Sequence, residues 1–288
     1  MTRVVLVHGI AQQVEGPRSL LDHWYPKLCD GLILADRPVV PIEEVTMAFY
    51  GDLFRPAGHR SVGVPDLDAS DVQEGLEEDL LLQWWEAAAA VESQVTGPEV
   101  RVRMRTWRPV QRALDALSHS SFFAAMAEHL MILSARQVRR YFTEPDIREE
   151  IGDRLVKEVT DDTEVIVAHS LGSVVAYETL CAHPEWSDLT LVTLGSPLAV
   201  RGTVFDRLVP PPRDGLARWP APVKAWTNIA DGGDLVALVK ELAPAFGKRV
   251  DDLPVHNGVK AHDVRPYLTA RETGTAIGKA LAGPGSGD

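Results

Sequence analysis

The sequence predicts an α/β fold, with a mainly parallel β-sheet flanked by helices. Short apolar runs rich in β-branched residues alternate along the chain with longer stretches of helical periodicity. A run that is apolar over its whole length is typical of a strand buried on both faces, as in a parallel sheet. Alternation of strands and helices supports the same class, because parallel neighbours need crossover connections. The 288 residues, 45% of them hydrophobic, suffice for a full core.

The expected strands are marked by Val, Ile, Thr and aromatic residues, which favour extended backbone. They span 4–7, 45–50, 164–168, 189–194, 223–229 and 250–255. Helices are expected at 19–34, 172–182, 234–243 and 266–282, the first of them with one apolar side. Ser19 is a suitable N-cap for the first of them.

The alternation is interrupted after residue 51. Residues 52–70 are rich in Pro, Gly and Asp and are expected to form a loop. Helical periodicity then follows over about 71–95, 106–142 and 145–159. We therefore expect a single domain over 1–282 that carries a mostly helical insertion at about 52–150. The tail at 283–288 is expected to be disordered.

Large apolar side chains are frequent in this insertion. In the simplest interpretation they pack the helices against the sheet and against one another. In the alternative, some of them cover a substrate pocket, so that the insertion acts as a lid. The residues concerned are Trp84, Trp85, Phe122, Phe123, Met126 and Met131.

Composition and charge exclude several classes of protein. A formal net charge of -12 argues against nucleic acid and anionic membranes as partners. Cys29 and Cys181 match no metal or redox spacing and are expected to be buried thiols in a reducing compartment. No apolar run reaches the length of an integral membrane segment, and the expected first strand leaves no room for a signal peptide. We expect a cytoplasmic protein, and its oligomeric state stays open.

One segment carries a chemical signal. EVIVAHSLGS, at 164–173, places Ser170 between an expected strand and an expected helix. A sharp turn at this point holds a serine side chain above the sheet edge, and it requires small residues two positions before and after. Gly172 meets that requirement, and Ala168 departs from the usual glycine by one methyl group. The plainer interpretation is that Ser170 caps an ordinary helix.

A second segment, VVLVHGI, favours the chemical interpretation. It ends a buried strand with His8 and Gly9, and a glycine there lets the next backbone N–H point at a reacting oxygen. The N–H groups of Ile10 and Leu171 would then form an oxyanion hole. His8 itself is expected to be structural, with hydrogen bonds to the backbone of the loop.

These segments, together with LVTLGSP, NIADGGDLVAL and AHDVRPYL, resemble the α/β-hydrolase superfamily. The matching elements follow the family's order of serine, acid and histidine, and they cover most of the chain outside residues 52–150. Within the superfamily the chain is most similar to lipases and esterases, including the branch near the GPI inositol-deacylases. The resemblance implies an α/β-hydrolase fold that lacks the family's first two strands.

A serine hydroxyl needs a neutral imidazole as its base and a carboxylate that orients the imidazole. The resemblance implies Asp234 as the acid and His262, in the loop before the last helix, as the base. Asp231 is the alternative acid and would otherwise brace the turn, while Asp206 is a distant third choice. His256 is the less favoured histidine. Asp234 could instead be only the N-cap of the next helix.

The resemblance implies a serine hydrolase that cleaves a small-molecule or lipid-like carboxylic ester through an acyl-serine intermediate. No cofactor and no metal are expected, because the sequence contains no trusted metal-ligand spacing and no Rossmann or P-loop glycine pattern. An acyltransferase, thioesterase or cyclase using the same residues is one alternative. A non-catalytic binding or scaffold protein on a hydrolase fold is another, because fold does not fix function.

Overall fold

The computed structural model describes residues 2–55, 67–98, 108–123 and 127–282. Within them, six strands form one sheet in the order β2-β1-β3-β4-β5-β6, and every neighbouring pair is parallel. The strands are β1 (Val4–Val7), β2 (Val45–Ala48), β3 (Val165–His169), β4 (Leu189–Leu194), β5 (Val223–Asp231) and β6 (Val250–Val255). The predicted α/β class with a parallel sheet is therefore confirmed.

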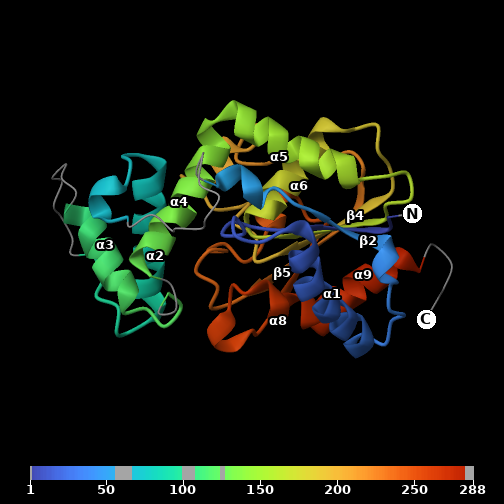
Figure 1. Ribbon diagram of the computed structural model, residues 1–288, viewed down its shortest axis with the longest axis horizontal. Helices are drawn as coiled ribbons and strands as arrows, with labels where there is room; N and C mark the ends of the chain where they lie inside the picture. The colour runs from blue at the N-terminus through green and yellow to red at the C-terminus, as the bar shows by residue number, and fades with distance from the viewer. Residues whose placement is uncertain (1, 56–66, 99–107, 124–126, 283–288) are drawn as a thin grey trace.

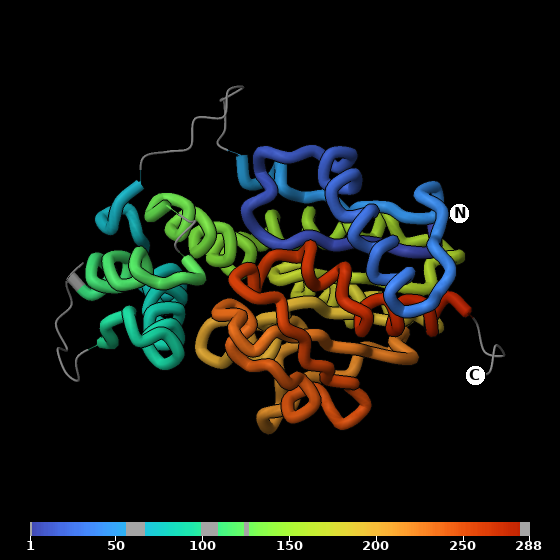
Figure 2. Tube along the Cα trace, turned by 90° about the horizontal axis from the view of Figure 1, so that it is seen from below, coloured from blue at the N-terminus to red at the C-terminus, as the bar shows by residue number. Residues whose placement is uncertain are grey.

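Helices cover both faces of this sheet (Figure 1). One face carries α5 (Pro145–Glu158) and α6 (Leu171–Ala182). The other carries α1 (Pro17–Leu34), α8 (Val264–Thr269) and α9 (Arg271–Leu281), which lie in front of the sheet in Figure 2.

The sequence of β1 follows from its position between these two layers. Side chains alternate between the faces of a strand. Val5 and Val7 accordingly pack into the core under α5 and α6, whereas Val4 and Leu6 pack into the core under α1, α8 and α9. None of the four is exposed to solvent. Burial on both faces explains why the strand is a continuous apolar run.

Three helices stand beside the sheet with a core of their own (Figures 1 and 2). They are α2 (Leu76–Val91), α3 (Arg108–Ser118) and α4 (Glu128–Thr143). Glu77 of α2 is fully buried and accepts a hydrogen bond of 2.7 Å from Arg139 of α4. This ion pair and the apolar core hold α2 against α4.

The stretch expected as one helix over 106–142 contains two helices, α3 and α4. Between them, the carboxylate of Glu92 accepts hydrogen bonds from Ser120 Oγ at 2.8 Å and from the N–H of Ser121 at 2.7 Å. Because these groups bond to Glu92, the chain turns here instead of continuing a helix. Met126 and the tail at 283–288 lie outside the described residues.

The prediction of a helix over 234–243 is wrong. The only helical turn nearby within the described residues is α7 (Ala243–Phe246). Leu235 packs into the core of α2, α3 and α4, whereas Leu242 packs into the core of the sheet. Positions seven apart on a helix point to the same side, so a helix could not place these two side chains in different cores.

Two smaller expectations also change. The last predicted helix is divided at Ala270 into α8 and α9. Cys29 and Cys181 are half-buried free thiols and not fully buried ones. Across the part of the chain that the structure describes, no helix is both long enough and apolar enough to cross a membrane.

Candidate functional site

Ser170 lies in the tight turn that joins β3 to α6. Its φ of 53° and ψ of -129° belong to a region that strains any residue with a side chain. The turn is also crowded: a Cβ on Gly172 would lie 2.4 Å from the carbonyl oxygen of His8. A Cβ on Gly9 would lie 2.8 Å from the Cβ of Ser170. The close approach of two loops explains why the sequence has glycine at both positions.

Three side chains form a continuous chain of hydrogen bonds at the carboxyl edge of the sheet. His262 Nε2 lies 3.0 Å from Ser170 Oγ, and His262 Nδ1 lies 2.8 Å from Asp234 Oδ2. Ser170 follows β3, Asp234 follows β5 and His262 follows β6, so parallel strands bring all three residues to one edge. Nδ1–H donates to the carboxylate, which leaves Nε2 free to accept the serine proton.

Asp234 is fully buried and every oxygen of its carboxylate is bonded. Oδ1 accepts from the N–H groups of Val236 at 2.9 Å and Ala237 at 3.1 Å, and Oδ2 also accepts from the hydroxyl of Tyr267 at 2.9 Å. Burial alone would raise the pKa of the Asp234 carboxyl. His262 and the two N–H groups outweigh burial and hold that pKa below its usual value.

The two alternative acids have other partners. Asp231 accepts hydrogen bonds from the N–H groups of Gly233, at 2.6 Å, and Asn257. His256, the less favoured base, is 3.9 Å from Asp231 and its side chain is 91% exposed. Asp206 accepts from the N–H of Gly202 at 2.6 Å. Asp231 therefore braces the turn before Asp234, and Asp206 braces a separate loop.

His8 is buried and structural, as expected. Its Nδ1–H donates to the carbonyl of Gly9 at 2.6 Å, and its Nε2 accepts from the N–H of Tyr50 at 3.0 Å. The Tyr50 hydroxyl donates in turn to the His8 carbonyl. Burial lowers the pKa of His8 to about 4, so the ring is neutral at pH 7.

The loop after His8 brings Ile10 into the lining of the small cavity that also contains Ser170. Ala11 has a φ of 64° and donates its N–H to Gln137 of α4 at 2.9 Å, which fixes the loop. Leu171 is the first residue of α6, where an N–H has no acceptor within its own helix. Within the described residues, the N–H groups of Ile10 and Leu171 have no hydrogen-bond partner. Two free donors thus belong to residues that line the same small cavity as Ser170.

Two residues that support the site could not be found from the sequence pattern. His169 lies beneath His262, with 4.8 Å between ring centroids, and its Nε2–H donates to the His262 carbonyl at 2.9 Å. Burial and the neighbouring His262 lower the pKa of His169 to about 3. Tyr267 accepts from the N–H of Asp231 at 2.8 Å and donates to Asp234. His169 simply precedes the serine, and Tyr267 follows His262 by five positions. Neither spacing is a known sequence motif for a role at the site.

The cavity beside Ser170 has a volume of about 30 Å³ and a mainly apolar lining. Trp84 of α2 lines it, but Trp85 does not. Trp85 instead donates its indole N–H to the carbonyl of Thr96 at 2.7 Å. Phe122 does not line this cavity, but its ring centroid lies 6.4 Å from that of His262. Only some of the aromatic residues considered as a cover therefore face the site.

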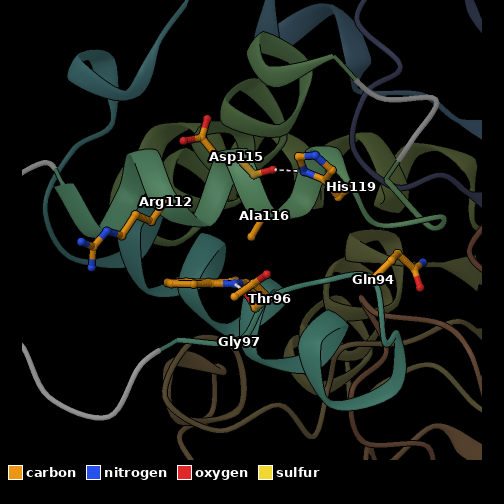
Figure 3. Close-up of a pocket in the computed structure, with 8 residues that line it drawn as sticks. Gln94, Thr96, Gly97, Arg112, Asp115, Ala116 and His119 are labelled. Atoms are coloured by element: carbon orange, nitrogen blue, oxygen red, sulfur yellow. Dashed lines mark hydrogen bonds between the residues drawn. The ribbon is translucent and has the colours of Figure 1, made fainter.

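A larger hollow of about 430 Å³ lies within the insertion (Figure 3). Its lining includes Arg112 and Asp115 of α3 and His119, which follows α3. Trp85 of α2 and residues of the segment after α2 complete the lining. His119 is bonded at 2.8 Å to the backbone carbonyl of Asp115, and the lining side chains are not hydrogen-bonded to one another. This hollow shares no lining residue with the cavity at Ser170.

Within the described residues, no three His, Cys, Asp or Glu side chains gather as metal ligands would. No model of a known protein family matches the chain, and no curated protein sequence matches it. A functional assignment therefore depends on the geometry around Ser170.

Proposed function

We propose that the protein is a serine hydrolase of the α/β-hydrolase superfamily that cleaves a carboxylic ester through an acyl-serine intermediate. The observation that carries this proposal is the unbroken hydrogen-bonded chain Ser170–His262–Asp234, with its serine in a strained turn. The order of the three residues along the chain and the parallel sheet beneath them support the proposal. The substrate is a small-molecule or lipid-like ester.

In the first half of the reaction Ser170 Oγ attacks the ester carbonyl carbon, and His262 Nε2 takes the hydroxyl proton. The carbonyl π electrons move to the oxygen, and the N–H groups of Ile10 and Leu171 stabilise its negative charge. The intermediate then collapses: the carbon–oxygen bond to the alcohol breaks, and His262 gives its proton to the departing oxygen. In the second half, water attacks the acyl carbon while His262 Nε2 takes a proton from it. The bond to Ser170 Oγ then breaks, His262 returns the proton to Oγ, and the carboxylic acid leaves.

The surroundings of His262 suit a residue that gains and loses one proton per step. The buried carboxylate of Asp234 stabilises the imidazolium cation and fixes the tautomer of the neutral ring. His169 beneath it stays neutral because its pKa is lowered to about 3. His169 therefore does not compete with His262 for the serine proton.

The proposal is tested by rapid mixing with p-nitrophenyl butyrate. We expect a burst of about one p-nitrophenol per protein molecule, followed by slower turnover, because acylation by an activated ester precedes hydrolysis of the acyl-serine. Butyric acid should accumulate in step with p-nitrophenol after the burst. Ser170→Ala should give neither phase.

Two of the alternatives, a scaffold and an acyltransferase, predict different results. A binding or scaffold protein would release no p-nitrophenol above the background rate. An acyltransferase supplied with glycerol or a thiol would form the new ester or thioester and little free acid. Either result would contradict the hydrolytic assignment.

A further inference from the structure

The cavity beside Ser170 lies on one side of the proposed reaction centre. Its lining includes Ile10 and Leu171, whose N–H groups we assign to the oxyanion, but it does not include His262. His262 must hand its proton to the departing alcohol, so the alcohol lies on the His262 side, where Phe122 is the aromatic neighbour. The cavity at Ser170, whose lining does not include His262, is left for the acyl chain.

The cavity is small. Its volume is about 30 Å³, and about 10–15 Å³ measured in this way holds one water molecule. It therefore has room for two or three water-sized groups beyond the carbonyl carbon. An unbranched acyl group of about four carbons fills that space.

The part of the lining that Trp84 forms is held in place by its neighbours. Trp84 is 4% exposed, and its ring packs against Phe123 at a centroid distance of 5.8 Å. Next to it, the Gln83 amide accepts from Thr203 Oγ1 at 2.8 Å and donates to the Arg201 carbonyl at 3.1 Å. These contacts join α2 to the loop after β4, so a longer acyl chain would have to displace packed side chains.

We propose that this cavity is the acyl pocket, that it admits acyl groups of up to about four carbons, and that Trp84 sets the limit. This inference rests on the proposed serine hydrolase function and goes beyond it, because it names the substrate class as short-chain acyl esters. Trp84 acts on specificity and takes no part in proton transfer.

The test compares two neighbouring tryptophans of α2. Trp84 and Trp85 are both buried, at 4% and 7% exposure, but Trp85 lies outside the cavity. Trp84→Leu and Trp85→Leu remove the same volume from buried positions, so a changed chain-length profile in Trp84→Leu alone would not be a general effect of damaged packing. The measurement is kcat/KM for p-nitrophenyl acetate, butyrate, hexanoate and octanoate, with the melting temperature of each protein.

For the wild type we expect kcat/KM to fall about 10-fold or more from butyrate to octanoate, because a pocket discriminates strongly once each added methylene must displace its wall. Trp84→Leu should raise the ratio of octanoate to butyrate by about 10-fold or more. Trp85→Leu should leave that ratio within about two-fold of the wild type, even where it lowers the melting temperature. Trp84→Phe should raise the ratio of octanoate to butyrate by a smaller factor. This variant replaces Trp84→Leu in the test if Trp84→Leu does not fold.

A wild type that cleaves octanoate as fast as butyrate would overturn the inference, and so would equal profiles for the Trp84 and Trp85 variants. Labelling with a small fluorophosphonate, run in parallel, separates the two proposals. A labelled protein with a flat chain-length profile contradicts the acyl limit alone. A protein that is neither labelled nor active contradicts the proposed function as well.

Discussion

Replacing Asp234 by asparagine is expected to lower kcat for p-nitrophenyl butyrate by about 10⁴-fold, with little change in the fold. The asparagine amide N–H would donate to His262 Nδ1 and leave the proton of the neutral ring on Nε2. That tautomer cannot accept the proton of Ser170. The N–H groups of Val236 and Ala237 remain available to hold the new side chain in place. Steady-state kinetics with a melting curve on each variant measures both effects.

Asp231→Asn is the matched control for this change. Asp231 is also buried and lies three positions before Asp234. Its carboxylate accepts hydrogen bonds from the N–H groups of Gly233 and Asn257 and not from His262. We expect this variant to lose less than about 10-fold in kcat, by loosening the turn before Asp234. If Asp231→Asn were the more damaging change, the role of the acid would move to Asp231.

The protein is expected to lose stability as the pH falls below about 6.5, because His8 and His169 are buried in the neutral form. Their pKa values are lowered to about 4 and about 3 in the folded chain. Between these values and pH 6.5 the unfolded chain binds more protons than the folded one, so stability decreases with falling pH. Well inside that window, each histidine lowers the free energy of unfolding by about 1.4 kcal/mol for every pH unit that the pH falls. From pH 6.5 to 4.5 the two together remove about 4 kcal/mol.

Urea unfolding at several pH values between 4.5 and 7 measures this loss. The lowered pKa of Asp234 adds little in that range, because its contribution is lost only as the pH falls below about 3.8. His169→Gln keeps an amide that can donate to the His262 carbonyl but cannot titrate. It should remove about half of the pH dependence. An unchanged pH dependence in His169→Gln would show that His169 does not carry the effect.

The strands could be predicted from the sequence because burial on both faces leaves a continuous apolar run. Val4–Val7 is found as expected, and β3 differs from the predicted range of 164–168 by one residue at each end. The stretch over 234–243 was predicted wrongly, because Leu235 and Leu242 pack into two different cores. Periodicity reports that residues are apolar, but not which neighbour covers them. Local patterns therefore predict the sheet better than the loops at its edge.

For the site, sequence reasoning selected Ser170, Asp234 and His262, and the structure brings them within hydrogen-bond distance. The signal for Ser170 was local, since small residues surround the serine, whereas Asp234 and His262 were expected from the resemblance to the α/β-hydrolase superfamily. His169 acts through a contact with a residue 93 positions away, which no local pattern reveals. Periodicity equally could not decide which of Trp84 and Trp85 faces Ser170.

The most direct test of the central claim is covalent labelling with a fluorophosphonate, followed by peptide mass spectrometry. The reagent phosphonylates a serine only where a base activates the hydroxyl, so it needs no knowledge of the substrate. We expect one adduct per chain, on Ser170, and no adduct in Ser170→Ala, with the same circular dichroism for both proteins. An unlabelled wild type, or labelling that persists in Ser170→Ala, would contradict the assignment of Ser170 as the nucleophile.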